Sequence, residues 1–376
     1  MISKPIFSRV IATTLLVLFV YVRPALVQDG AKDKAKKIDE LMQTYYDNKQ
    51  FNGTVLVAEK GSVIYKKGFG LANMEWNIPN EPDVKFRIGS ITKQFTSMLI
   101  MQLVQEGKIK LEGKLIDYLT DYRKDTGDKV TIHNLLTHTS GIPSYTELPR
   151  FFQDVSREPY TVTDFVKKYC SGDLEFEPGS QFKYDNSGYF LLGAVIEKVT
   201  GKTYEQVLKE RIFDPVKMQD SGYDHFDTII ARRAAGYGKG PKGTQNAFYL
   251  DMSIPYAAGS LYSTVEDLYK WDQALYTEKL LPEKYKEMMF KPFLKNYAYG
   301  WFIQKLSLGD TQGTYHAVEH GGGINGFNTL ITRFTDDRHL IVLMNNTGGA
   351  KLDEMRSNIA KILYGKPYTL PTKKPE

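Results

Sequence analysis

The spacing of apolar residues near the start of the chain predicts one helix followed by one β-hairpin. Apolar positions recur with a helical period over about 33–46, which indicates an amphipathic helix. Two short apolar runs, 54–58 and 62–65, come next, with Glu59-Lys60-Gly61 between them. Two strand-like runs joined by a short polar segment that contains glycine are typical of a hairpin.

The middle of the chain, from Ser90 to about Met218, is rich in helical signals. Ser90 leads an apolar face with helical spacing, and this face ends at Gly107, a residue typical of helix C-termini. Further helical patterns cover 132–136 and 189–198. We therefore expect a mostly helical region in the middle of the chain.

Strand-like patterns return toward the C-terminus. They cover 299–304, 327–333 and 339–344, and a final helical pattern covers 352–363. This order of elements predicts an α/β protein of the α+β type. Its antiparallel sheet is built from both ends of the chain, and helices flank the sheet.

The same order predicts the domain organisation. We expect one domain over 29–365, with a sheet subdomain from about 29–89 and 255–365 and a helical insert over about 90–254. A polar tail over 366–376 completes the chain. Functional sites in such proteins lie where the two parts meet.

The first 28 residues have the pattern of an export signal. Lys4 and Arg9 precede an apolar run over 10–22, which is short for a bilayer span and fits a signal-peptide core. We expect residues 1–28 to be a signal peptide and the protein to be periplasmic or secreted, with no stable membrane span after cleavage. An uncleaved N-terminal anchor is the alternative, because no Ala-x-Ala stands near Gln28.

Composition and charge narrow the class of partner. Of 376 residues, 42% are hydrophobic and 25% charged, as in an ordinary soluble globular protein. Outside residues 1–28, which contain three basic residues and no acid, 46 Lys and Arg face 44 Asp and Glu, a net charge of +2. This balance gives no reason to expect a nucleic-acid partner. Cys170 is the only cysteine, which excludes an intramolecular disulfide and a Cys-rich metal site.

Ser90 and Lys93 are the first candidate catalytic residues, as a nucleophile and its general base. At a helix start, a Ser-x-x-Lys pair puts a nucleophilic oxygen and a proton-accepting amine one turn apart on the same face. A second copy, Ser180 and Lys183, follows a Pro-Gly turn signal, and the residues after it alternate as in a strand. Only the first pair therefore has the expected geometry. Taken alone, that pair would favour a helix N-cap with a solvated lysine.

Two further segments carry groups that complement this pair. Tyr184 can take the Ser90 proton, and the Asn186 amide can orient Lys93 and bind a substrate carbonyl. The alternative for this segment is a simple helix cap. The run 320–326, His-Gly-Gly-Gly-Ile-Asn-Gly, lets a substrate approach the backbone, where one exposed N–H with that of Ser90 would form an oxyanion hole.

Together these segments resemble the serine β-lactamase-like family of penicillin-recognising enzymes. The family includes class C β-lactamases, D-alanyl-D-alanine carboxypeptidases, D-aminopeptidases and related esterases. Ser90-Ile-Thr-Lys93 matches its Ser-x-x-Lys motif, Tyr184-Asp-Asn186 matches Tyr-x-Asn, and His320-Gly-Gly322 stands where many members have Lys-Thr-Gly. Further similar stretches that carry no chemistry themselves are 135–143, 212–218 and 258–268.

The resemblance implies a β-lactamase/transpeptidase-like fold and a two-step mechanism. Ser90 would attack a carbonyl to form an acyl-enzyme that water releases, with Lys93 and Tyr184 sharing the role of general base. Poising a lysine near pH 7 needs its pKa to fall by about 3.4 units from ~10.4. By motif position, Gly322 and Gly323 line the substrate site, and Gly323 offers the second oxyanion N–H.

His320 departs from the family's motif, and this changes the expected substrate. It takes the place of a catalytic-site lysine that helps to hold a substrate carboxylate, and a neutral imidazole binds a carboxylate less strongly. We therefore expect an amide or ester substrate, most readily a D-amino-acid peptide or ester, as a small molecule or short peptide. A β-lactamase is the alternative within the family.

Two alternatives come from other classes. A penicillin-recognising binding protein without turnover would have little reason to retain Ser90, Lys93 and Tyr184 together. His316-Ala-Val-Glu319-His320 spells a zinc metalloprotease motif. That motif needs a helix, whereas the flanking residues indicate a strand, on which residues four apart lie about 13 Å from each other. We expect no metal and no cofactor.

Overall fold

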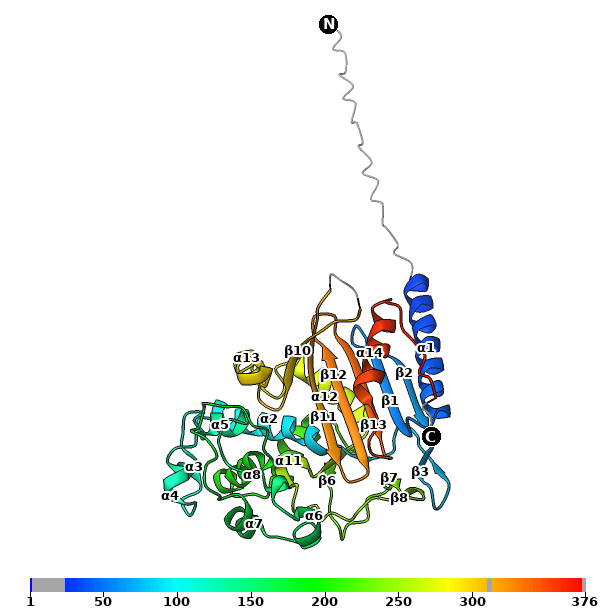
Figure 1. The fold of residues 1–376 in the computed structure, drawn as a ribbon. Helices are drawn as coiled ribbons and strands as arrows, with labels where there is room; N and C mark the ends of the chain where they lie inside the picture. The colour runs from blue at the N-terminus through cyan, green and yellow to red at the C-terminus, as the bar shows by residue number, and fades with distance from the viewer. Residues whose placement is uncertain (2–23, 310–312, 374–376) are drawn as a thin grey trace.

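The fold is known from a computed structural model that describes Met1, residues 24–309 and residues 313–373. The expected signal peptide over 1–28 lies almost entirely outside the described residues. The described chain forms one main sheet with helices on both faces, and a mostly helical part lies beside one end of the sheet (Figure 1).

The main sheet joins the two ends of the chain. It has six antiparallel strands in the order β10-β11-β12-β13-β1-β2, so that β1 from the N-terminal part pairs with β13 from the C-terminal part. In Figure 1 the blue strands therefore lie directly beside the orange and red ones. The strands are β1 (Gly53–Glu59), β2 (Ser62–Phe69), β10 (Phe302–Leu306), β11 (Tyr315–Ile324), β12 (Phe327–Phe334) and β13 (His339–Asn345).

Two helices from opposite ends of the chain cover one face of this sheet. They are α1 (Pro24–Asp47) and α14 (Leu352–Leu363), which lie side by side in Figure 1. Their apolar faces form a core with the strands, in which Ile38, Leu41 and Ile359 are fully buried. On the other face α12 (Val265–Leu275) packs against β1 and β13.

The helical part is built around α2 (Thr92–Gln105), which is buried over most of its length. A 3-10 turn over Gly89–Ile91 leads into α2, and α8 (Asn186–Thr200) and α11 (Tyr256–Gly259) pack against it. The remaining helices of this region are α3 (Leu115–Tyr118), α4 (Lys124–Gly127), α5 (Ile132–Leu136), α6 (Phe151–Asp154), α7 (Val162–Tyr169), α9 (Tyr204–Leu208), α10 (Asp214–Val216) and α13 (Glu283–Phe290).

A small sheet brings the start of α2 next to α11. Its order is β5-β9-β6, with β5 (Phe86–Arg87) just before the 3-10 turn and β9 (Leu261–Ser263) just after α11. The Ile88 N–H donates to Leu261 O at 2.9 Å, which fixes the two segments together. The other short strands are β3 (Leu71–Asn73), β4 (Ile78–Pro79), β6 (Gly222–Tyr223), β7 (Tyr237–Gly240) and β8 (Gly243–Asn246).

Most of the elements expected from apolar spacing are present. The hairpin β1–β2, the helix α2 ending next to Gly107, and the helices α5, α8 and α14 are confirmed, and the first helix begins earlier than expected, at Pro24. Two expectations were wrong in detail. The strand expected over 299–304 begins only at Phe302, after Gly300 with φ +78°, and the alternating stretch after Ser180 is irregular instead of a strand.

Within residues 24–309 and 313–373, no helix is both long and apolar enough to cross a bilayer.

Candidate active site

Ser90 lies at the point where β5 turns into α2. Gly89 adopts φ +51°, and a Cβ there would lie only 3.0 Å from the backbone nitrogen of Gly323. Glycine is therefore required for the tight turn that leads into the helix. The 3-10 turn at Gly89–Ile91 then places Ser90 at the N-terminal end of α2, where the helix dipole favours negative charge.

Lys93 follows one turn later, and its side chain is fully buried. Its Nζ lies 3.1 Å from Ser90 Oγ, 2.8 Å from Asn186 Oδ1 and 2.9 Å from the Ala258 carbonyl oxygen. A carbonyl and an amide oxygen can only accept hydrogen bonds, so a neutral amine must donate to both. Its lone pair is then left for Ser90, the one neighbour of the three that can donate a proton.

Burial also sets the charge of this amine. It lowers the pKa of Lys93 to about 7, and the negative charge of Asp185 opposes the shift. The aromatic rings of Tyr184 and Tyr189 surround the amine, with centroids 4.9 Å and 5.5 Å from Nζ. A large part of Lys93 is therefore neutral at physiological pH, as a general base requires.

The Tyr184 hydroxyl is buried close to the same pair. It has no full hydrogen bond to any of the residues that the structure describes. Burial raises the pKa of Tyr184 well above its usual value, and the nearby Ser90 hydroxyl only partly offsets this. The phenol consequently keeps its proton and is available as a donor.

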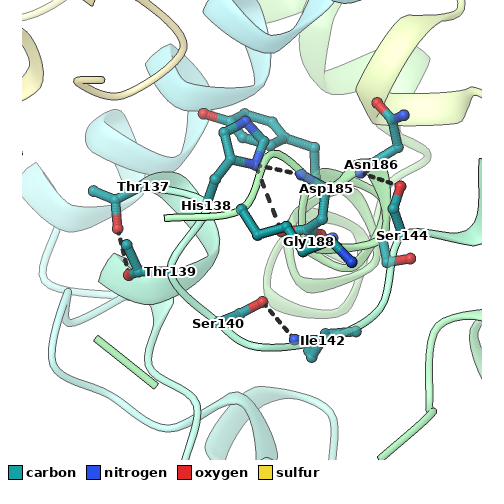
Figure 2. A network of polar contacts seen from close by, with 12 residues as sticks. Thr137, His138, Thr139, Ser140, Ile142, Ser144, Asp185, Asn186 and Gly188 are labelled. Carbon is teal, nitrogen blue, oxygen red and sulfur yellow. Dashed lines mark hydrogen bonds and ion pairs between the residues drawn. The ribbon is translucent and has the colours of Figure 1, made fainter. Parts of the chain in front are cut away.

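Asn186 begins α8, and the residue before it caps that helix. The Asp185 side chain accepts from the Gly188 N–H, so the expected capping role is present beside the site role. Asn186 accepts from Lys93 through Oδ1, and its Nδ2 donates to Thr146 Oγ1 at 3.1 Å. The Asn186 backbone N–H donates to Ser144 Oγ at 3.1 Å (Figure 2).

His320 lies on β11 next to this group, but it is buried and does not line the cavity at Ser90. Its Nδ1 lies 2.6 Å from the Gly321 carbonyl oxygen, an obligate acceptor, so Nδ1 carries the proton. Nε2 then accepts from the Tyr297 hydroxyl at 3.1 Å. Burial and the positive charge of Lys93 lower the pKa of His320 to about 3, so the imidazole is neutral.

The glycines after His320 let β11 approach the turn at Ser90. A Cβ on Gly322 would lie 1.9 Å from Ile88 O, whereas a Cβ on Gly323 would meet no atom within 4 Å. Thr329 Oγ1 donates to Ile88 O at 2.9 Å and holds the two segments together. Gly322 is thus needed for the close approach, and Gly323 faces the open side.

A cavity of about 110 Å³ opens at Ser90 between β11 and the helical part. Both Asn186 and Gly323 line it, whereas Lys93 and Tyr184 do not. Among the described residues, no charged side chain lines it. The lining residues are Ser90, Tyr145, Thr146, Phe151, Phe152, Asn186, Leu250, Ile254, Pro255, Ala258, Gly259, Gly323, Ile324 and Asn325.

The other motifs of the sequence do not form a second site. Ser180 Oγ donates to Glu177 O, and Lys183 Nζ bonds to Glu175 and Glu147. His316 lies on β11, which confirms the strand expected there and leaves the zinc motif without its helix. His316 is next to Asp336, and Glu319 accepts from Arg356. Within the described part of the chain, no group of three His, Cys, Asp or Glu side chains could hold a metal ion.

Several groups that support the site were not singled out from the sequence. Ser144 and Thr146 hold Asn186, and the Ala258 carbonyl accepts from Lys93. Ser144 directly follows the similar stretch 135–143, and Ala258 begins the similar stretch 258–268. No chemistry was assigned to either stretch. Backbone carbonyls carry no sequence signal, so the contact at Ala258 could not be read from its residue type.

Comparison with known proteins gives the family. A family model named Beta-lactamase matches residues 36–364. Penicillin-binding protein 4* of Bacillus subtilis (strain 168) is 30% identical over 363 residues, which cover 90% of this chain and 78% of the relative. Teichoic acid D-alanine hydrolase of Staphylococcus aureus (strain MRSA252) is 27% identical, over 91% of this chain and 81% of the relative.

A solved structure supports the same assignment. The penicillin-binding protein from Bacillus halodurans superposes with a TM-score of 0.76 at 29% identity, over 86% of this chain and 98% of that one. The expected β-lactamase/transpeptidase-like fold is confirmed. The chain therefore belongs to the β-lactamase family of serine hydrolases.

Proposed function

We propose that the protein hydrolyses an amide or ester through an acyl-enzyme on Ser90. Lys93 is the general base, Tyr184 relays the proton, and Asn186 holds the base in place. The observation that carries this proposal is the set of three contacts at Lys93 Nζ, two to obligate acceptors and one to Ser90 Oγ. A buried neutral amine in that setting can take only the Ser90 proton.

The first step forms the acyl-enzyme. Ser90 Oγ attacks the substrate carbonyl carbon as its proton passes to Lys93 Nζ, and the carbonyl oxygen becomes an oxyanion. The Ser90 N–H at the N-terminal end of α2 and the Gly323 N–H on β11 stabilise that charge. As the bond to the leaving group breaks, the Tyr184 hydroxyl gives its proton to the leaving amine or alcohol and regains one from Lys93.

The second step releases the product. A water molecule attacks the acyl carbon. Its proton passes to Lys93, either directly or through the Tyr184 hydroxyl. The ester bond to Ser90 then breaks, and Oγ recovers a proton. His320 is neutral, is hydrogen-bonded to Tyr297 and does not line the cavity, so it contacts no substrate in this scheme.

The cavity lining supports a substrate without a carboxylate. Apolar side chains such as Phe151, Leu250 and Ile254 make up most of the wall, and no cation faces the cavity within the described residues. Amide and hydroxyl groups of Asn186 and Thr146 remain to bind a small polar group. The lining thus favours an uncharged amide or ester bond, and the name of one relative, teichoic acid D-alanine hydrolase, supports D-aminoacyl esters and amides within that class.

The same lining disfavours a β-lactamase or a carboxypeptidase. β-Lactam antibiotics and D-alanyl-D-alanine peptides carry a free carboxylate that needs a cation or several donors. The position of the family lysine is occupied here by His320, whose pKa of about 3 keeps it neutral. Efficient turnover of these substrates is not expected.

We also propose that 29–365 is one catalytic domain and that the protein is exported. A single apolar core connects the sheet with the helical part, since Leu56, Leu340 and Phe190 belong to the same cluster of buried residues.

The charged and apolar pattern over 1–28 supports export. Mass spectrometry of mature protein from the native host would locate its N-terminus.

The experiment that tests the function compares wild type with Ser90→Ala on three substrate classes. These are p-nitrophenyl esters, D-amino-acid p-nitroanilides, and the β-lactam nitrocefin. We expect wild type to cleave the first or second class and nitrocefin poorly or not at all, and Ser90→Ala to be inactive on all. No turnover together with reversible binding of penicillin would instead favour a binding protein. Activity that survives Ser90→Ala would contradict the serine mechanism.

A further inference from the structure

His138 is a buried histidine in an uncommon backbone conformation. It follows the C-terminal end of α5 and adopts φ +55°, in the left-handed region that glycine usually occupies after a helix. A side chain there costs conformational energy, so its presence at a strained position points to a function. The imidazole has no solvent exposure.

This residue holds the chain on both sides of Tyr184. The Lys183 N–H donates to the His138 carbonyl oxygen at 2.9 Å, and the Asp185 N–H donates to His138 Nδ1 at 3.1 Å. Figure 2 shows the imidazole facing the Asp185 backbone. Two hydrogen bonds to one residue therefore hold the backbone N–H groups of Lys183 and Asp185, on either side of Tyr184.

The imidazole also packs on the Tyr184 ring. Their centroids lie 4.2 Å apart with an interplanar angle of 39°, and the Tyr297 ring contacts the imidazole on another side at 4.6 Å. Nδ1 lies 3.1 Å from the Asp185 backbone N–H, an obligate donor, and 3.5 Å from Asp185 Oδ2, so the shorter contact places the proton of the neutral imidazole on Nε2. Nε2 is buried and has no hydrogen-bond partner among the described residues. The ring thus contacts Tyr184 mainly by packing, while its Nδ1 holds the backbone.

We propose that His138 is a positioning residue, which sets the place and tilt of the Tyr184 phenol relative to Ser90 and Lys93. The inference rests on the function proposed above, because it assigns His138 a role only through Tyr184. His138 does not line the cavity and touches neither Ser90 nor the substrate space. Its loss should therefore lower kcat and leave KM nearly unchanged.

Two substitutions separate positioning from simple stability. His138→Gly suits φ +55° but removes both the imidazole and the Nδ1 acceptor, and we expect kcat to fall about 10²-fold with KM within about twofold. His138→Asn also tolerates this conformation, and its Oδ1 can accept from the Asp185 N–H. We expect it to restore kcat to within about tenfold of wild type. Lys217→Gly, at an exposed residue with φ +60°, is the matched backbone control and should be fully active.

A double-mutant cycle with Tyr184→Phe gives the decisive readout. If His138 acts through the Tyr184 hydroxyl, His138→Gly lowers kcat about 10²-fold in wild type but less than about threefold in Tyr184→Phe. Equal losses in both backgrounds, or an unchanged kcat in folded His138→Gly, would overturn the inference. Should His138→Gly fail to fold, a folded His138→Asn that loses 10²-fold or more would overturn it instead.

Ser90→Ala, measured in the same assay, distinguishes a failure of the proposed function from a failure of the role of His138. If Ser90→Ala retains hydrolysis, the proposed function itself fails. If Ser90 is essential and the double-mutant cycle is additive, only the role of His138 fails. Thermal melting of every variant shows whether a loss of kcat accompanies a loss of fold.

Discussion

The amine of Lys93 lies 2.8 Å from the amide oxygen of Asn186, and this contact joins α2 to the start of α8. An amide oxygen accepts hydrogen bonds but cannot donate one. Asn186 therefore fixes the direction of one Lys93 N–H whether the amine is charged or neutral. With Ala258 O taking a second N–H, the remaining position on the amine faces Ser90.

The first prediction concerns the pH dependence of the reaction. A general base must be unprotonated, and burial lowers the pKa of Lys93 to about 7. We expect kcat/KM to rise about tenfold per pH unit below pH 7 and to level off above it. His320, with a pKa near 3, adds no step between pH 5 and 9. Steady-state kinetics on an uncharged ester would measure this, and a rise centred near pH 10 would contradict it.

The second prediction concerns stability. Between a pKa of about 7 in the folded protein and about 10.5 in the unfolded chain, the unfolded state binds more protons at Lys93. Stability contributed by this group therefore increases with pH across that range, by up to about 1.4 kcal/mol per pH unit. Lys93→Met removes the effect and should be more stable than wild type at pH 7.

Urea unfolding at pH 7, 8 and 9 measures that difference. The stability advantage of Lys93→Met should shrink as the pH rises. Only wild type has a buried amine, and the cost of burying its charge disappears as Lys93 is deprotonated. All other titrating groups are shared by the two proteins and cancel. A difference that stays constant from pH 7 to 9 would mean that the buried amine has an ordinary pKa.

The third prediction separates the Tyr184 hydroxyl from its ring. Tyr184→Phe keeps the ring contacts but removes a buried hydroxyl that lacks a full hydrogen bond among the described residues. We expect kcat to fall about 10²–10⁴-fold, as for loss of a proton-transfer group. The melting temperature should stay unchanged or rise slightly, because an unsatisfied buried polar group is lost. Near-wild-type kcat in this variant would remove Tyr184 from the proton path.

Much of the fold could be predicted from apolar spacing because its elements have strong periods. The helix at Ser90 and the paired strands near 54–65 follow from local pattern, and the Ser-x-x-Lys pair needs only helical geometry. Local pattern failed where backbone conformation overrode it. The stretch after Ser180 alternates like a strand, yet it is irregular. Its backbone forms hydrogen bonds to residues outside any strand, as the Lys183 N–H does to the His138 carbonyl oxygen.

The site was harder to predict where it depends on distant contacts. Tyr184 and Asn186 were recognised through their motif, but Ser144, Thr146 and the Ala258 carbonyl became visible only once three segments came together. The burial of His320 was also not apparent from its position in a glycine-rich run. Glycine by itself indicates neither exposure nor burial, and here it allows β11 to pack closely against the turn at Ser90.

The fourth prediction tests that close approach with a matched pair of variants. Gly322→Ala places a methyl group 1.9 Å from Ile88 O, so the strand or the turn must move. We expect it to lose about 1–3 kcal/mol of stability and most activity. Gly323→Ala, whose methyl group meets nothing within 4 Å, should fold normally. Denaturant unfolding of both variants would check this, and equal stabilities would show that the strand does not approach Ile88 closely.

The most direct test of the central claim is the intact mass of the protein during turnover. Wild type mixed with a slowly deacylating p-nitrophenyl ester should gain the mass of one acyl group, and peptide mapping should place it on Ser90. Ser90→Ala should gain no mass, and Lys93→Met should gain it at least about 10²-fold more slowly. A covalent acyl group found elsewhere, or hydrolysis with no acylated protein and undiminished in Ser90→Ala, would contradict the account.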